Sequence, residues 1–116
     1  MINAPELDID EDGYPTEDSL EQLQRWLDEN PELSAEFMLG PFCETPRYIT
    51  GCSIERYDVD EKRTAVTFHT GGWSGAESYI ETILRCGSIY VLYYAKWERG
   101  GHYTFIVPIP KKEDAS

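Results

Sequence analysis

The chain has 116 residues, of which 41% are hydrophobic and 28% charged. This composition is typical of one globular domain rather than of a disordered segment. No apolar run approaches the roughly 18 residues that a membrane-spanning helix needs, and the acidic N-terminus is unlike a secretory signal. The net charge of −12 disfavours direct contact with nucleic acid or an anionic membrane. We therefore expect a single cytoplasmic domain over residues 1–116.

The negative charge is concentrated in residues 1–36, which contain twelve acidic residues and a single base, Arg25. Residues 1–13 alternate small apolar residues with acids, and we expect them to form a flexible or loosely docked acidic arm. A field of this sign steers association with basic protein surfaces. The alternative interpretation is a solvated acidic surface without a dedicated partner. The candidate partner-binding residues are Asp8, Asp10, Glu11, Asp12, Glu17, Asp18, Glu21 and Asp28.

Two helices are predicted after this arm. Thr16 can cap the first one, because acids follow it in the first turn and apolar residues then recur at helical spacing, at Leu20, Leu23 and Leu27. Asn30 and Pro31 end this helix and begin a second one, which stops before Gly40 and Pro41. Residues 42–47 are expected to be a connection.

The C-terminal half is predicted to contain four strands and one helix. Residues 48–59 and 64–70 are rich in β-branched and aromatic residues and flank a charged hairpin loop. A helix over 74–86 follows, with Gly87 as its stop. Residues 88–98 are apolar on both faces, which suits a central strand, and 102–109 form its antiparallel partner. The expected fold is therefore α+β: two N-terminal helices, then ββαββ with a four-stranded, mostly antiparallel sheet packed by one helix.

Two glycine turns are candidates for a ligand site. The first is Thr70-Gly-Gly-Trp-Ser-Gly-Ala-Glu77, and the second is Arg99-Gly-Gly-His-Tyr103. Ser74 and Glu77 have the spacing of a capping box at a helix start, and a glycine turn before a helix is the plan of an anion site. The alternative is a structural elbow that seats the helix on the sheet. The candidate ligand-binding residues are Gly71, Gly72, Trp73, Ser74, Arg99 and His102.

His69 and His102, the only two histidines, each lie beside one of these turns. If both turns lie at the same end of the sheet, the imidazoles could approach each other, with Glu77 or Arg99 nearby. Acid–base chemistry requires such convergence, whereas two structural histidines are the alternative.

The remaining residues give little sign of catalysis. Cys43, Cys52 and Cys86 form an odd set without a Cys-x-x-Cys pair, which indicates free thiols in a reducing compartment. We expect no metal, no cofactor and no catalytic residue. The aromatic residues of the second half fit core packing, and those with an exposed edge, such as Tyr or Trp, also suit a protein interface.

The two glycine motifs, read together as Thr70 to Glu77 and Arg99-Gly-Gly-His-Tyr-Thr-Phe105, resemble a pattern in small proteins encoded by phages and prophages of actinobacteria. The resemblance covers residues 70–109. It implies a phage or prophage origin and an existence inside the host cell. That family has no assigned activity, so the resemblance supplies no catalytic residue.

These observations lead to two hypotheses about function. The first is a non-catalytic phage or prophage accessory protein whose acidic N-terminal region binds a basic, nucleic-acid-binding surface of a host protein. In its sharpest form it is an anti-CRISPR-like inhibitor that mimics nucleic acid and blocks a defence or replication protein. The second is a small enzyme or an anion- or ligand-binding protein that uses the turns at 70–77 and 99–103. The sequence leaves the oligomeric state open.

Overall fold

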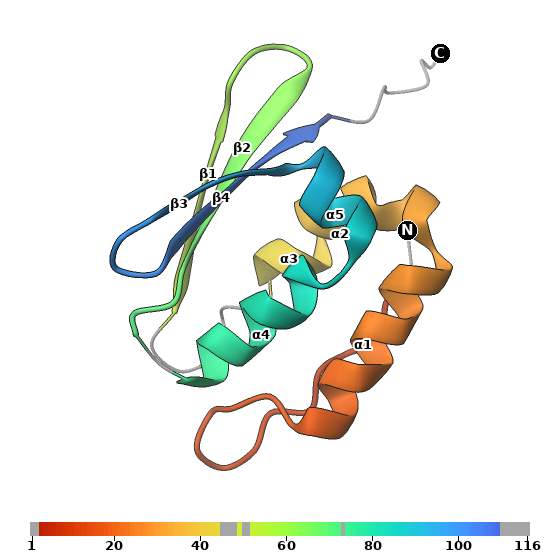
Figure 1. Cartoon of the computed structure of the whole chain (residues 1–116), viewed down its shortest axis with the longest axis vertical. Coiled ribbons are helices and arrows are strands. Elements are labelled where there is room, and N and C mark those ends of the chain that lie inside the picture. The colour runs from red at the N-terminus through yellow and green to blue at the C-terminus, as the bar shows by residue number, and fades with distance from the viewer. Residues whose placement is uncertain (1–2, 45–48, 50–51, 73, 110–116) are drawn as a thin grey trace.

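A computed structural model of the chain describes residues 3–44, 49, 52–72 and 74–109 (Figure 1). The predicted α+β fold is confirmed: helices pack on one side of a four-stranded antiparallel sheet. None of the helices in this part of the chain has the length and apolarity that crossing a bilayer requires. The elements are α1 (Glu17–Glu29), the 3-10 turn η1 (Pro31–Leu33), α2 (Ser34–Leu39), α3 (Pro41–Glu44), β1 (Ser53–Asp58), β2 (Arg63–His69), α4 (Ser74–Leu84), α5 (Gly87–Leu92), β3 (Tyr94–Glu98) and β4 (His102–Pro108).

The strand order is β1-β2-β4-β3, so that β2 and β4 are the central strands. Alternate residues of both, such as Val66 and Phe105, are directly opposite each other and buried beneath the helices. The prediction of a central strand in residues 88–98 is therefore wrong in two respects. Residues 87–92 form α5, and the remaining strand, β3, lies at the edge. A short two-sided apolar run does not distinguish a strand from a helix by periodicity.

The boundary between α4 and α5 also differs from the prediction. The helix ends at Leu84 rather than at 86, and Gly87 begins α5 instead of stopping α4. The expected connection at 42–47 is wrong in its first part, because α3 occupies 41–44 and its Phe42 is fully buried. The Phe42 ring lies 5.6 Å from both Phe68 and Phe105. This aromatic residue joins the helical layer to the sheet.

Helix α1 begins as predicted. Thr16 Oγ1 accepts a hydrogen bond from the Ser19 backbone at 3.3 Å. The buried side of α1 consists of Ser19 and three leucines. Helix α1 contacts α4, so the acidic helix lies beside the packing helix (Figure 1). Part of the expected arm also contacts the protein: the Thr16 N–H binds the Asp8 carbonyl, and Leu7 and Ile9 pack against the core.

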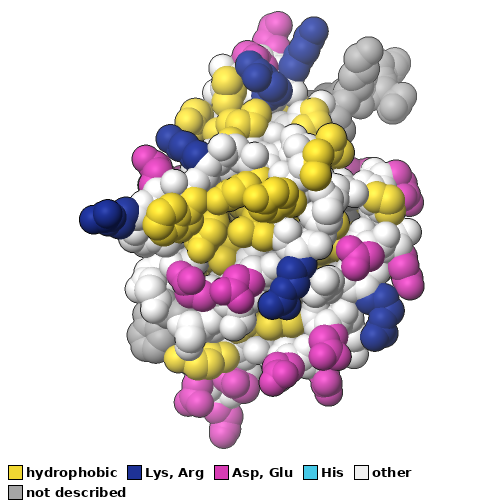
Figure 2. Space-filling view, viewed as in Figure 1, with side chains coloured by type: hydrophobic (Ala, Val, Ile, Leu, Met, Phe, Trp, Pro, Cys, Tyr) yellow, Lys and Arg dark blue, Asp and Glu magenta, His cyan; other side chains and the backbone are white. Residues whose placement is uncertain are grey.

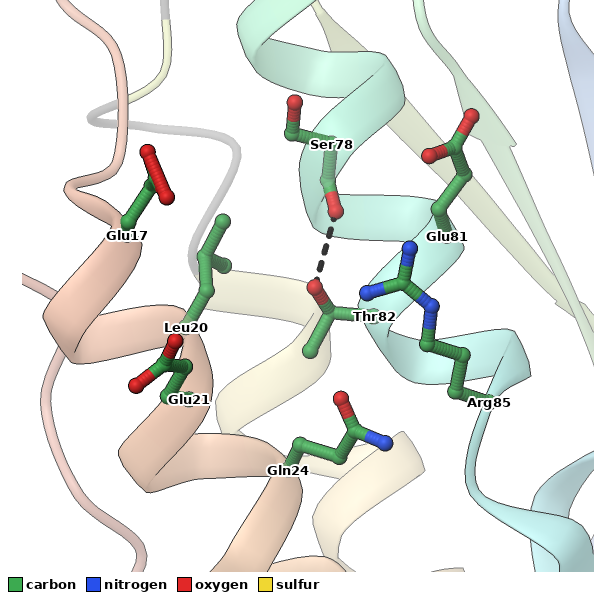
Figure 3. A pocket seen from close by; sticks show the side chains of 8 residues that line it. All are labelled: Glu17, Leu20, Glu21, Gln24, Ser78, Glu81, Thr82 and Arg85. Atoms are coloured by element: carbon green, nitrogen blue, oxygen red, sulfur yellow. Dashed lines mark hydrogen bonds between the residues drawn. The ribbon is translucent and has the colours of Figure 1, made fainter.

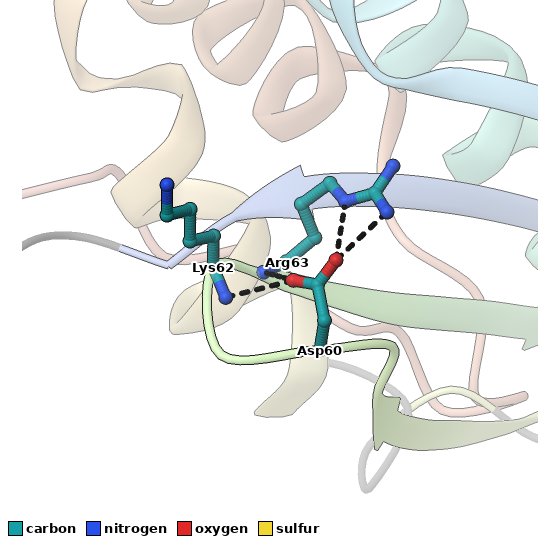
Figure 4. Close-up of polar contacts among 3 residues, drawn as sticks. All are labelled: Asp60, Lys62 and Arg63. Atoms are coloured by element: carbon teal, nitrogen blue, oxygen red, sulfur yellow. Dashed lines mark hydrogen bonds and ion pairs between the residues drawn. The ribbon is translucent and has the colours of Figure 1, made fainter.

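The charged loop between β1 and β2 is organised by Asp60 (Figure 4). Its Oδ1 accepts the backbone N–H groups of Lys62 and Arg63 at 2.8 and 3.0 Å, and its Oδ2 accepts the Arg63 guanidinium at 2.8 Å. The Arg63 hydrogen bonds, followed by the Lys62 N–H, hold the pKa of Asp60 below its ordinary value. This confirms the predicted hairpin loop and fixes the strand register beside it.

Candidate functional site

The two glycine turns meet in the folded protein. The Thr70 N–H donates to the Gly101 carbonyl at 2.9 Å, and the Thr70 hydroxyl donates to Glu77 Oε2 at 2.7 Å. The same hydroxyl oxygen accepts the Gly72 N–H at 3.2 Å. We call these four residues, Thr70, Gly72, Glu77 and Gly101, the Thr70 joint. It connects β2, the start of α4 and the turn between β3 and β4.

Glycine is required at position 101 of this joint. Its φ is +80°, a conformation that residues with a side chain rarely adopt. A Cβ at this position would also overlap Thr70 Oγ1 and approach Glu77 Oε2 to 3.5 Å. The close approach of the two turns therefore depends on the missing side chain.

The geometry of the joint disfavours an anion site. An anion cradle needs free N–H groups, but those of Thr70 and Gly72 already bind acceptors within the joint. The Glu77 carboxylate, which binds the Thr70 hydroxyl within the joint, would repel an anion there. These contacts fit the alternative interpretation, a structural elbow, and the ligand site stays a prediction.

The other predicted ligand residues are dispersed around the turns. Gly71, Ser74 and Arg99 are exposed, and Trp73 lies outside the described residues. The predicted capping box does not form, because Ser74 is already the first residue of α4 and Glu77 binds Thr70. A capping box would need Ser74 one position before the helix.

The two histidines converge, as the second hypothesis requires. His69 of β2 and His102 of β4 are directly opposite in the sheet, and their ring centroids lie 4.4 Å apart in an edge-to-face arrangement. Both lie on the face of the sheet turned away from the helices, where Thr67 and Thr104 share a 2.9 Å hydrogen bond.

The acidic neighbour of this pair is Glu55 of β1, which residue spacing did not indicate. Its Oε1 lies 3.5 Å from His69 Nε2, close enough for an ion pair but without hydrogen-bond geometry. Glu77, the expected neighbour, binds Thr70 instead. Glu55 is diagonal to His69 across the β1–β2 pair, so only the strand register could have revealed the contact. Within the described part of the chain, no group of three or more His, Cys, Asp or Glu side chains could hold a metal ion.

The cysteines are poorly suited to act as nucleophiles. All three are free thiols. Burial raises the pKa of Cys52 to about 11 and also raises that of Cys43, against the opposing effect of Arg56. The raised pKa keeps both thiols protonated at neutral pH. Because the thiolate is the reactive form, neither thiol is activated as a nucleophile.

The eight predicted partner-binding residues are all exposed, and together we call them the acidic surface. Four lie on the solvent side of α1, and four lie in the segment before it. Asp10 has an additional structural role, because its Oδ1 accepts the N–H groups of Asp12 and Tyr14 at 2.9 and 3.0 Å. The side chain thereby shapes the turn that carries its acidic neighbours.

A groove of about 190 Å³ runs between α1 and α4 (Figure 3). Glu17 and Glu21 line it from α1, and Glu81 of α4 and Arg85, the residue after α4, line it from the other side. This groove extends the acidic surface onto α4. Its lining places one basic side chain among three carboxylates.

No protein-family model matches the sequence, and neither a curated protein nor a solved structure matches it.

Proposed function

We propose that this chain is a non-catalytic protein-binding module whose acidic surface engages a basic, nucleic-acid-binding surface of another protein. In the sharpest form of the proposal, carboxylates take the places of phosphates and exclude the nucleic acid. The resemblance of the glycine motifs to phage and prophage proteins suggests a host defence or replication protein as the partner, in the cytoplasm of the host cell.

The observation that carries the proposal is that the carboxylates of α1 are exposed and form no salt bridge with another described residue, although Arg85 lines the groove beside Glu17 and Glu21. None of the ion pairs between described residues involves Glu17, Asp18, Glu21 or Asp28. Surface carboxylates are screened by water and salt, but those without an ion-pair partner still steer association with a basic surface and can contact it.

Deleting residues 1–36 would not test this proposal, because the deletion removes Leu23 and Leu27, which are fully buried. The test instead uses full-length variants. One variant neutralises four acids of the acidic surface, with the changes Glu11→Gln, Asp18→Asn, Glu21→Gln and Asp28→Asn. Its matched control neutralises four exposed acids elsewhere, with the changes Glu32→Gln, Glu36→Gln, Glu44→Gln and Glu61→Gln.

Both variants lose four negative charges, so that a difference between them reports position rather than net charge. Immobilised wild-type protein and the control should capture the same partner from an actinobacterial host lysate, and the first variant should not. The captured partner should then lose its nucleic acid when wild-type protein is added. Equal capture by both variants, or a partner that keeps its nucleic acid, would contradict the proposal.

A second candidate function is a ligand or acid–base site at the two histidines, and the 4.4 Å contact between His69 and His102 favours it. Thermal-shift screening of small polar metabolites tests it. A hit should stabilise the wild type and leave the His102→Gln variant unaffected.

A further inference from the structure

A band of aromatic side chains lies at the β3 edge of the sheet. It consists of Tyr90 of α5, Tyr94 and Trp97 of β3, and Tyr103 of β4, and we call these four residues the aromatic band. Figure 2 shows hydrophobic side chains forming a continuous strip over β3 and α5. Tyr90 and Trp97 are each 54% exposed, and a contiguous exposed apolar strip of this kind is typical of an interaction site, whereas single exposed residues are not.

A β-bulge gives the band its shape. Tyr94 pairs with Phe105 and Trp97 pairs with Tyr103, and the register shifts between Tyr94 and Lys96. In a regular strand, residues three apart point to opposite faces. The bulge therefore brings Tyr94 and Trp97 onto the same face, and the 5.6 Å contact of Tyr94 with Phe105 anchors the band to the core.

The band lies beside an open sheet edge. β3 is the last strand in the order, and within the described residues no strand pairs with its outer side. Its outward backbone N–H and C=O groups are therefore available to an extended chain. The opposite edge strand, β1, has no comparable band, because three of its exposed residues, Glu55, Arg56 and Asp58, are charged.

Carboxylates border the aromatic band on its α4 side. Figure 2 shows Asp and Glu side chains over α4 directly beside the strip. Burial raises the pKa of Tyr103, and the charge of Glu77 and a smaller effect of Glu81 raise it further, in agreement with the carboxylates that Figure 2 shows beside the strip. Neither Glu77 nor Glu81 forms an ion pair with another described residue, and Glu81 is exposed.

We propose that the aromatic band and the outer edge of β3 bind an extended, Lys- or Arg-bearing segment of a partner protein. Aromatic ring faces attract cations, the adjacent carboxylates pair with them, and the strand edge binds the backbone of the segment. A second copy of this chain fits less well, because its net charge of −12 would bring like charges together. The aromatic band and the outer edge of β3 share no residue with the acidic surface, so the inference stands independently of the proposed function.

The test titrates ¹⁵N-labelled protein with a short peptide in which Lys alternates with Thr, at physiological ionic strength. The expected shifts are in the amides of residues 94–98 and the indole N–H of Trp97. The same peptide with Gln in place of Lys should bind about tenfold more weakly, because it loses the cationic interactions.

Two pairs of variants distinguish binding at the aromatic band from non-specific binding to exposed rings or carboxylates elsewhere. Trp97→Ala should weaken binding about tenfold, whereas Tyr57→Ala, which removes an aromatic ring of similar exposure from β1, should not. Glu81→Gln should weaken binding roughly threefold, whereas the equally exposed Glu61→Gln should not. The four-fold neutralised variant of the acidic surface should keep the shifts in β3.

Several results would overturn the inference. They are shifts confined to α1, equal binding of the Lys and Gln peptides, or equal losses from Trp97→Ala and Tyr57→Ala. A dimer in sedimentation that Trp97→Ala dissociates would show that a second copy covers the band. If the peptide does not bind at β3, the proposal that the acidic surface captures a partner is unaffected. If the capture experiment fails, the proposal for the aromatic band is likewise unaffected.

Discussion

The Thr70 hydroxyl donates a 2.7 Å hydrogen bond to the Glu77 carboxylate, and this pair fixes the approach of α4 to the sheet. Thr70 is fully buried and its backbone also binds Gly101. One residue therefore connects the end of β2, the first turn of α4 and the β3–β4 turn. This joint explains why the second glycine motif has no side chain at Gly101.

Replacing Thr70 with valine should destabilise the protein by about 1–3 kcal/mol. The change keeps the shape of the side chain but leaves the Glu77 carboxylate and the Gly72 N–H without their partner. Urea denaturation measures the loss. Glu81→Gln, one turn further along α4 and exposed, is the control and should change the midpoint little.

Gly101→Ala should destabilise the protein by more than about 2 kcal/mol. The new Cβ would overlap Thr70 Oγ1 and the backbone would be strained at φ +80°. Gly72→Ala is a matched control, because Gly72 has the same φ of +80° but a Cβ added there would meet nothing within 4 Å. It should cost only the strain, roughly 1–2 kcal/mol. Equal losses would mean that steric overlap at the joint is unimportant.

Gly75→Ala tests the packing of the N-terminal turn on α4. A Cβ at Gly75 would lie 2.7 Å from Cδ1 of Tyr14, so the substitution should destabilise the wild type by about 1–2 kcal/mol. In a Tyr14→Ala background the overlap is absent, and the higher helix propensity of alanine should make the same change neutral or stabilising by up to about 1 kcal/mol. A double-mutant cycle from thermal unfolding measures the coupling, and additive effects would exclude the contact.

Stability should fall as the pH rises from about 9 to about 11. The Cys52 thiol ionises at its ordinary value of 9.0 in the unfolded chain and at about 11 in the folded protein. In this window the unfolded state therefore binds fewer protons, and unfolding becomes more favourable with rising pH. Tyr94 and Tyr103 act in the same direction, because burial raises the pKa of both.

The Cys52→Ser variant measures how much the ionisation of the Cys52 thiol contributes to this pH dependence of stability. Serine keeps a donor for the Ile49 carbonyl, which accepts from Cys52 Sγ at 3.3 Å, but it does not ionise in this range. Urea midpoints measured across the window should fall less steeply for this variant than for the wild type. An unchanged slope would assign the whole effect to Cys43 and the two tyrosines, whose pKa values are also raised.

The sequence determined the features that depend on short-range chemistry. Thr16 and the leucines of α1 predicted the first helix, since a cap and a 3.6-residue repeat are local signals. The sequence also predicted the strands around the Asp60 loop and the turns at 70–77 and 99–103. It showed directly that acids are concentrated near the N-terminus. These signals were sufficient to predict the α+β class and the exposure of the eight acidic residues.

Only the tertiary structure decided how these parts meet. The pairing of β2 with β4 brings His69 to His102 and Thr70 to Gly101, and a register is a long-range property that residue spacing does not encode. The apolar run at 88–98 was ambiguous for the same reason: burial, not periodicity, makes part of it α5 and part of it an exposed edge. The aromatic band at that edge exists because a bulge turns Tyr94 and Trp97 to one face, and the packing of α4 leaves that face uncovered.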